Sequence, residues 1–256
     1  MMPSVYAPKD FKRLRASGDI VARFFDFVRP HILPGLTTGA IDNMARDFLR
    51  ENGARSASLG YRGFPGFVCT SVNDVIVHGI PSDEVVLREG DILNIDLTAE
   101  FKGFHADASQ MFCVGRVSPA AQKLCDVTLD ALNSAIAVCG PGVPISEIGK
   151  VIEVIAAANG YSIVRDFVGH GIGKNMHDDP QVHHYYERAN DKVLMVPGLV
   201  FTIEPMINQG MADGMMDSDG WTVRTTDGKL SAQWEHTIGI TEDGAIVFTE
   251  KLTIDS

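Results

Sequence analysis

Residues 90–96 read Gly-Asp-Ile-Leu-Asn-Ile-Asp, and residues 198–204 read Gly-Leu-Val-Phe-Thr-Ile-Glu. Each segment combines a turn glycine, a run of β-forming residues and a carboxylate at its last position. Apolar runs bounded by turn residues are typical of buried strands. A strand that ends in a carboxylate is therefore expected twice in this chain, once after Gly90 and once after Gly198.

The repeat extends upstream into a helix. Pro34-Gly35 precedes Asn52-Gly53 at the same spacing that separates Pro141-Gly142 from Asn159-Gly160. Both intervening segments place apolar residues at i, i+3, i+4, i+7 and i+8, the pattern of one buried helical face. These residues are Ile41, Met44, Ala45, Phe48 and Leu49 in the first copy, and Ile148, Val151, Ile152, Ile155 and Ala156 in the second. Chance similarity of amphipathic elements is the alternative, but a nearly constant shift across helix, turn and strand favours duplication.

Two related halves, about 34–110 and 141–240, predict one α/β (α+β) domain over residues 1–256, with a single sheet covered by helices on one face. Asp96 and Glu204 would occupy equivalent positions and could face one another across a pseudo-two-fold axis. Thr38 and Ser146 are the expected helix N-caps, and Gly53 and Gly160 the residues that end the helices. Further helices are expected over 8–31 and from Ser118-Pro119 to about Cys139, strands near 74–78, 92–98, 106–114, 199–204, 231–240 and 245–248, and a loop over 209–220.

Composition excludes several classes of protein. The chain is 45% hydrophobic and 21% charged, as in ordinary globular proteins, and its net charge is −11. That charge argues against broad nucleic-acid binding, so no DNA partner is expected. No apolar run approaches the length that spans a membrane and no signal peptide is visible, so no membrane association is expected. The four cysteines form no CxxC pair, which indicates reduced thiols and a cytoplasmic protein.

Asp96 and Asp107 flank a hairpin signal at Lys102-Gly103. Opposed residues of an antiparallel pair share one face and lie about 5 Å apart, so both carboxylates could reach the same ions. A solvated hairpin face is the ordinary alternative. However, Asp96 ends the apolar run Ile92–Ile95, where a buried charge is costly without a cation.

Three further residues complete a candidate metal site: His170 in Gly-His-Gly-Ile-Gly, Glu204 in Phe-Thr-Ile-Glu-Pro and Glu235 in Gln-Trp-Glu-His-Thr. Neither glutamate has an arginine or lysine close in sequence that could pair with it. Four carboxylates and one imidazole form an oxygen-rich donor set that suits Mn²⁺, Fe²⁺, Co²⁺ or Mg²⁺. A turn histidine and paired surface acids remain the alternatives for each motif taken alone.

Other candidate motifs carry little weight. No GxGxxG, P-loop, GxSxG or HExxH motif is present. Cys69 could be a nucleophile, but a buried core cysteine is the more ordinary interpretation. The remaining histidines are interpreted as surface or core residues: His31, His105, His183, His184 and His236.

In this order and combination, the motifs resemble those of the type I methionine aminopeptidases, in the M24 family of metallopeptidases, from about residue 10 to 250. The matching segments are Asn94–Asp96, Phe104–Asp107, Gly169–Gly173, Phe201–Pro205, Glu235–Thr237, His78–Pro81, and His177 with Pro180–Val182. The resemblance implies the duplicated pita-bread fold, with a curved, mostly antiparallel sheet covered by helices. It also implies a cytoplasmic, monomeric single catalytic domain without an N-terminal zinc-finger extension.

By this resemblance, the enzyme removes the initiator methionine from nascent proteins and peptides when the second residue is small. Asp107 and Glu235 would bridge two divalent ions (Co²⁺, Mn²⁺, Fe²⁺ or Zn²⁺), Asp96 would chelate one, and His170 with Glu204 would complete the other. Glu204 would take a proton as the metal-activated water attacks the scissile carbonyl. His177 would contact the carbonyl oxygen, and His78 the scissile amide. The implied partners are nascent N-termini with a free methionine amine, with the ribosome as a candidate.

The methionine pocket implied by the family pattern is made of side chains that can contact a thioether. They are Tyr61, Phe64, Cys69, Met176 and Trp221, with Ser58 at the edge. Common bacterial versions have Cys, Tyr and Phe at positions 58, 64 and 176, so selectivity among side chains could differ here. The loop 211–219 is acidic where many relatives carry lysines, which puts a basic partner contact there in doubt.

Three alternatives are weighed against this interpretation. X-Pro aminopeptidases and prolidases share the fold but carry an additional N-terminal domain. Type II methionine aminopeptidases carry a helical insertion between the two glutamate segments, whereas the short stretch between Glu204 and Glu235 disfavours one here. A non-catalytic binding protein of the same fold would typically lose metal ligands, and all five are present.

Overall fold

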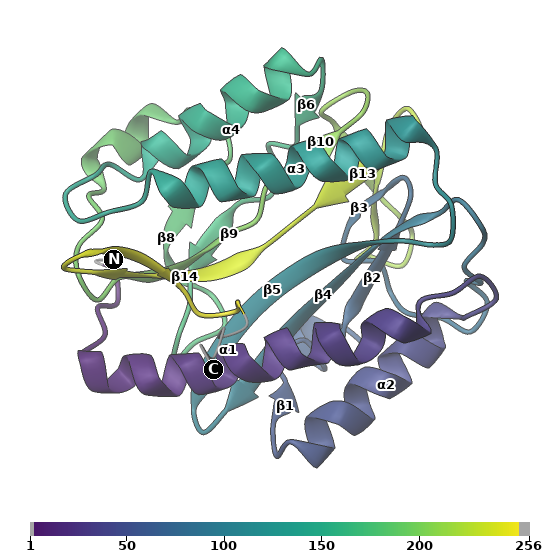
Figure 1. Cartoon of the computed structure of the whole chain (residues 1–256), viewed down its shortest axis with the longest axis horizontal. Helices are drawn as coiled ribbons and strands as arrows, with labels where there is room; N and C mark the ends of the chain where they lie inside the picture. The colour runs from purple at the N-terminus through teal and green to yellow at the C-terminus, as the bar shows by residue number, and fades with distance from the viewer. Residues whose placement is uncertain (1–2, 251–256) are drawn as a thin grey trace, which may run out of the picture.

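The computed structural model describes residues 3–250, in which helices alternate with groups of strands (Figure 1). The α-helices are α1 (Pro8–Val28), α2 (Thr38–Glu51), α3 (Pro119–Ala137) and α4 (Ser146–Ala158), and the 3-10 helices are η1 (Arg29–His31), η2 (Tyr61–Gly63) and η3 (Arg188–Lys192). The strands are β1 (Arg55–Ser56), β2 (Cys69–Val72), β3 (Val75–Val77), β4 (Ile92–Phe101), β5 (Phe104–Cys113), β6 (Ser162–Ile163), β7 (Gly169–Gly171), β8 (Asp178–Val182), β9 (Val200–Ile203), β10 (Met206–Asn208), β11 (Gly214–Met216), β12 (Val223–Thr225), β13 (Ser231–Gln233), β14 (His236–Thr241) and β15 (Gly244–Val247). Within residues 3–250, no helix is long and apolar enough to cross a membrane.

Two pairs of helices flank the strands, with α1 and α2 along one side and α3 and α4 along the other (Figure 1). One apolar cluster, which includes Phe25 and Leu93, joins α1 and α2 to β4 and β5. A second cluster, which includes Ile152 and Phe201, joins α3 and α4 to β9, β10 and β14. Burying one apolar face of each helix against a sheet is the ordinary way to build an α/β layer. Two helix-covered halves are what the sequence repeat leads us to expect, although their common origin stays a prediction.

All strand pairs resolved within residues 3–250 are antiparallel. β4 pairs with β1, β2 and β5, while the largest sheet has the order β15-β14-β9-β7-β8. Two three-stranded sheets complete the arrangement, in the orders β13-β10-β6 and β11-β12-β3. The mostly antiparallel character expected from the sequence is therefore correct. The strands form four sheets, whereas a single sheet was expected from the sequence.

Most element boundaries agree with the sequence expectations, and the exceptions are local. Ser118 caps α3 by accepting a hydrogen bond from the Ala121 amide, and Gly53 and Gly160 follow their helices with φ of 65° and 73°. The other N-caps are displaced by one residue: Thr37 caps α2, and Ile145 precedes α4 without a side-chain cap. The expected loop 209–220 contains β11, because Gly214–Met216 pairs with β12 as a hairpin.

The β4–β5 hairpin turns at Lys102-Gly103, where both residues have positive φ, as in a type I′ turn. Its register sets Asp107 opposite Thr98, while Asp96 pairs with Ser109. The two aspartates share a face, as expected, but they are diagonal neighbours and not a directly opposed pair. The expectation of direct opposition was wrong because the turn is centred one position beyond the midpoint of the two aspartates.

Glu204 and Glu235 lie in two strand breaks that face each other. β9 ends at Ile203 and β10 begins at Met206, while β13 ends at Gln233 and β14 begins at His236. In the first break, Pro205 has no amide hydrogen to donate to a neighbouring strand. In the second, the Glu235 amide donates to the Ser109 carbonyl on β5. Because Ile203 pairs with His236 and Met206 with Gln233, the register continues across the gap and sets Glu204 opposite Glu235. The single strand expected over 231–240 is thus two strands that belong to different sheets.

Candidate metal centre and substrate cavity

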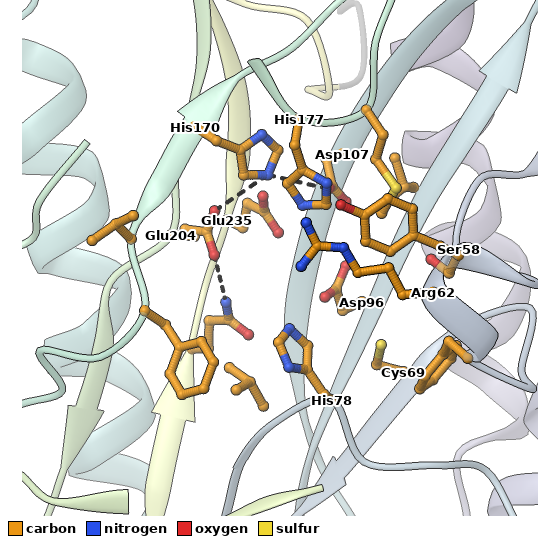
Figure 2. Close-up of a pocket in the computed structure, with 18 of the residues that line it drawn as sticks. Ser58, Arg62, Cys69, His78, Asp96, Asp107, His170, His177, Glu204 and Glu235 are labelled. Atoms are coloured by element: carbon orange, nitrogen blue, oxygen red, sulfur yellow. Dashed lines mark hydrogen bonds and ion pairs between the residues drawn. The ribbon is translucent and has the colours of Figure 1, made fainter. Parts of the chain in front are cut away.

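One cavity of about 580 Å³ lies between the two halves and collects all the site residues predicted from the sequence. Figure 2 shows the polar members pointing toward one another from β4, β5, β7 and the two strand breaks. The predicted residues that line it are Ser58, Tyr61, Phe64, Cys69, His78, Asp96, Asp107, His170, Met176, His177, Glu204, Trp221 and Glu235. Their chemical roles remain predictions, but their convergence is a feature of the structure.

Asp107, His170 and Glu235 form the tightest group in this cavity. One ligand atom of each lies within 4.8 Å of the others. The His170 Nε2 atom is 3.9 Å from Asp107 Oδ2 and 3.7 Å from Glu204 Oε1. Asp107 and Glu235 are almost completely buried, with 5% and 2% of their surfaces exposed. Such burial is unfavourable for ionised carboxylates unless a cation compensates them.

The pKa values of the buried carboxyl groups reflect this unfavourable burial. Burial raises the pKa of Asp107 to about 6 and the pKa of Glu204 to about 8. The pKa values of Asp96 and Glu235 are also raised, first by burial and then by repulsion from neighbouring carboxylates. In addition, Asp107 Oδ1 is buried without a hydrogen-bond partner among residues 3–250. Crowded acids with an unsatisfied oxygen are the donor set that a divalent cation would stabilise.

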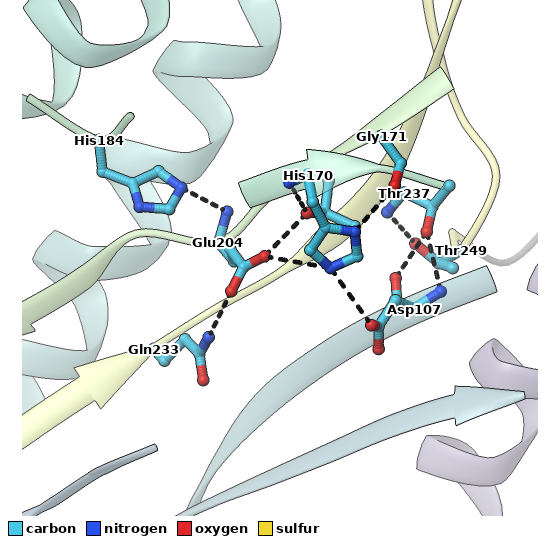
Figure 3. Close-up of polar contacts among 9 residues, drawn as sticks. Asp107, His170, Gly171, His184, Glu204, Gln233, Thr237 and Thr249 are labelled. Atoms are coloured by element: carbon cyan, nitrogen blue, oxygen red, sulfur yellow. Dashed lines mark hydrogen bonds and ion pairs between the residues drawn. The ribbon is translucent and has the colours of Figure 1, made fainter. Parts of the chain in front are cut away.

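His170 presents an unprotonated nitrogen to these carboxylates. Its Nδ1 atom lies 3.0 Å from the Gly171 carbonyl oxygen, which can only accept, so Nδ1 carries the proton and donates (Figure 3). Burial and the neighbouring His177 lower the pKa of His170 to about 3. The ring is therefore neutral, and the lone pair on Nε2 faces Asp107 and Glu204. This tautomer is the one that a metal-binding imidazole needs.

Hydrogen bonds from Thr202 on β9 and Gln233 on β13 orient the Glu204 side chain. Thr202 donates to Oε1 at 2.8 Å, and Gln233 Nε2 lies 3.3 Å from Oε2. Thr202 Oγ1 also accepts from the His170 amide, so one hydroxyl links both residues (Figure 3). The Glu204 amide donates to Nε2 of His184, a fully buried histidine. The Glu204 side chain and backbone are thus both fixed by groups from neighbouring segments.

The Asp107 backbone is held in a similar way by Thr237 on β14. The Thr237 hydroxyl accepts from the Asp107 amide at 2.9 Å and donates to the Asp107 carbonyl at 2.8 Å. These two bonds join the central hairpin of the first half to the sheet of the second. They therefore hold the Asp107 backbone against β14, two residues beyond Glu235.

Aromatic rings surround the outer part of the cavity. The His177 ring centroid is 4.2 Å from His170 and 5.0 Å from Tyr61. On the opposite wall, Trp221 packs edge-on against Phe64 at 5.2 Å and His78 at 5.9 Å. Burial lowers the pKa of His78 to about 4, so its imidazole is neutral at pH 7. The polar carboxylate floor and the aromatic walls together suit a ligand with a charged end and an apolar side chain.

Comparison with known proteins decides the family. The profile of metallopeptidase family M24 matches residues 12–242. The chain belongs to metallopeptidase family M24. Methionine aminopeptidase A of Synechocystis sp. is 47% identical over 241 residues, which are 94% of this chain and 95% of that protein. The methionine aminopeptidase of Escherichia coli K12 is 43% identical over 250 residues, covering 97% and 94%.

Solved structures agree with this M24 assignment. The crystal structure of methionine aminopeptidase from Rickettsia prowazekii matches with a TM-score of 0.94 and 42% identity, covering 97% of this chain and all of that chain. The pita-bread fold expected from the sequence is thereby confirmed. An M24 metallopeptidase requires divalent metal ions, and the buried donor set of Asp107, His170 and Glu235 fits them.

Sequence reasoning missed several residues of the M24 site. Thr202 and Gln233 each precede a predicted glutamate by two positions, and a strand period of two would place them on the same face. Arg62 lines the cavity without any sequence signal of this kind. The interpretation of Cys69 as a buried residue is supported: it is 7% exposed, and burial raises the pKa of its thiol, which disfavours a thiolate nucleophile.

Proposed function

We propose that this M24 chain is a type I methionine aminopeptidase that removes N-terminal methionine from peptides and nascent proteins whose second residue is small. The observation that carries the proposal is the convergence of four acids, a neutral His170 and an aromatic pocket in one cavity. Within the described residues, only strands β10–β13 and their loops separate Glu204 from Glu235, which supports type I over type II. The proposed setting is the cytoplasm, with the monomer as the active form and the ribosome as a candidate partner.

Five residues would hold two divalent ions, drawn from Co²⁺, Mn²⁺, Fe²⁺ and Zn²⁺: Asp96, Asp107, His170, Glu204 and Glu235. When bound, such ions supply a water that is activated at neutral pH and polarise a carbonyl group. Asp107 and Glu235 are the most buried of these acids, and they would hold the ions at the floor of the cavity.

Protein groups would perform the remaining tasks. Glu204 is the proposed proton acceptor, because its carboxyl lies among the proposed metal ligands and Thr202 and Gln233 hold both of its oxygens. His177 would donate to the scissile carbonyl oxygen as charge develops there. His78, neutral at pH 7, would donate to the nitrogen side of the scissile amide.

The apolar walls would accept the methionine side chain. Thioether sulfur contacts aromatic rings favourably, and Tyr61, Phe64 and Trp221 provide three such rings beside Met176 and Cys69. Ser58 lies at the edge of this wall. The free α-amine would bind near the carboxylate floor, which would restrict hydrolysis to the first peptide bond.

Hydrolysis of a Met-Ala-Ser peptide by the purified protein tests this proposal directly. The metal-free protein should be inactive, and Mn²⁺, Co²⁺ or Fe²⁺ should restore activity, whereas Asp107→Asn should bind less metal and remain inactive. Full activity after complete metal removal would refute metal dependence. Preference for Ala-Pro-Gly over Met-Ala-Ser would instead indicate an X-Pro peptidase, and metal binding without hydrolysis of either peptide would indicate a binding protein.

A further inference from the structure

Arg62 is the only arginine or lysine that lines the cavity in the described part of the chain. Six carboxylates line the same cavity: Asp96, Asp107, Asp178, Asp179, Glu204 and Glu235. Arg62 is exposed, and Figure 2 shows its guanidinium between His177 and His78. A positive charge at this position faces any peptide that enters or leaves the site.

The local backbone holds Arg62 in an unusual conformation. Its φ and ψ of 47° and 27° lie in the left-handed region, between Gly60 and Gly63, whose φ values are 80° and 90°. A residue with a Cβ is strained in this conformation, and glycine would avoid the strain. Such outliers are grounds for a functional hypothesis. Here the strained backbone places a long, solvent-exposed cationic side chain at the rim of the cavity.

Within residues 3–250, the guanidinium has no anionic partner of its own. It lies 5.4 Å from the centroid of the Tyr61 ring, and in the same range it forms no ion pair and donates no hydrogen bond. Arg62 nevertheless lines the same cavity as the proposed catalytic residues, with its guanidinium beside His177 (Figure 2). A planar guanidinium with unused donors is well suited to bind a carboxylate through two parallel hydrogen bonds.

The direction of the bound peptide indicates which part of it would meet Arg62. Under the proposed function, the amine and the methionine occupy the buried floor and aromatic walls. The chain beyond the scissile bond must then leave past the exposed rim, where Arg62 and His177 lie. We infer that Arg62 is a specificity-determining residue that favours substrates carrying a carboxylate downstream of the scissile bond. That carboxylate could belong to an Asp or Glu side chain, or to the C-terminus of a very short peptide.

The expected effect is modest because Arg62 is exposed. Exposed ion pairs are weak, and a preference of about fivefold, equivalent to about 1 kcal/mol, is their upper range. Salt at about 1 M reduces the screening length to about 3 Å and should remove most of the preference. A preference of about threefold to fivefold at low salt is therefore predicted.

The metal-loaded enzyme, assayed with matched peptide amides, tests this inference. The quantity of interest is kcat/KM for Met-Ala-Asp-Ala-amide divided by that for Met-Ala-Asn-Ala-amide. This ratio should fall about threefold to fivefold in Arg62→Gln and be largely retained in Arg62→Lys. In Arg62→Glu, Met-Ala-Lys-Ala-amide should become preferred over the Asp peptide. Comparison of Met-Ala-Ala with its amide distinguishes a C-terminal carboxylate from a side-chain carboxylate as the group that is recognised.

Arg88→Gln is the matched control, because Arg88 is an exposed arginine outside the cavity and its removal changes the net charge equally. It should leave the ratios unchanged. Equal ratios for the wild type and Arg62→Gln in both peptide pairs, or an equal shift in Arg88→Gln, would overturn the inference. If the Asn peptide is cleaved but no ratio depends on Arg62, this inference alone fails. If the metal-loaded wild type cleaves no Met-Ala peptide, the proposed function fails with it.

Discussion

The buried carboxyl of Glu204 should make the metal-free protein lose stability as pH rises, and Glu204→Gln should remove the part of this loss that Glu204 contributes. Asp96, Asp107 and Glu235, whose pKa values are also raised by burial, act in the same direction in both proteins. Burial raises the pKa of Glu204 to about 8 in the folded protein without a cation, compared with 4.5 for an unperturbed glutamate. Between these values the unfolded chain has released the proton while the folded protein retains it. A carboxyl of this kind imposes no penalty on folding below about pH 4.5 and its full penalty above about pH 8.

The magnitude follows from this difference in pKa. A difference of about 3.5 between the folded and unfolded pKa values corresponds to a full penalty of about 5 kcal/mol. By linkage, about 2 kcal/mol of this penalty applies at pH 6 and nearly all of it at pH 8.5. The free energy of unfolding of Glu204→Gln, relative to the wild type, should therefore grow by about 2–3 kcal/mol between pH 6 and pH 8.5.

The variant is compared with the wild type because other groups titrate in the opposite direction. Burial lowers the pKa values of His78, His170, His184 and His236, and their contribution to stability improves as pH rises toward 6.5. Both proteins retain these histidines, so their contributions cancel in the difference. Urea unfolding of metal-free protein, followed by circular dichroism at several pH values, measures the required free energies.

A saturating divalent ion provides the second control, since it compensates the carboxylates of the folded wild type and should flatten its pH dependence above pH 6.5. A constant difference between the metal-free wild type and Glu204→Gln from pH 6 to pH 8.5 would refute the reasoning. That result would mean that Glu204 is ionised in the folded protein without a cation.

Further predictions concern the roles of individual residues. His177→Ala should lower kcat by about 10²–10³-fold, as expected when one donor to a developing oxyanion is lost, while metal content measured by atomic emission stays unchanged. His170→Ala should lose metal, and similar metal loss in His177→Ala would place His177 among the ligands. Acetylation of the amine should abolish cleavage of a Met-Ala peptide, and a Met-Leu peptide should be a poor substrate; comparable turnover of Met-Ala and Met-Leu by mass spectrometry would contradict the proposed specificity. Thr237→Val should lower the free energy of unfolding by about 1–3 kcal/mol, because the buried Asp107 amide and carbonyl lose their partner, whereas the exposed Thr226→Val should change it little.

Local sequence patterns were sufficient for most of the secondary structure. The spacing of apolar residues predicted the helices, Ser118-Pro119 marked the start of α3, and Lys102-Gly103 marked the turn between β4 and β5. These signals act over a few residues, through capping hydrogen bonds, turn dihedrals and the period of a buried face. Motif combinations, interpreted through family resemblance, also predicted which residues line the cavity.

The tertiary structure alone decided how those residues face one another. The hairpin register made Asp96 and Asp107 diagonal neighbours, and the paired strand breaks set Glu204 opposite Glu235. The cationic rim at Arg62 likewise became visible only in three dimensions. Register, strand breaks and the position of a loop side chain depend on hydrogen bonds and packing between segments far apart in the chain, such as Thr237 with Asp107, which no local pattern encodes.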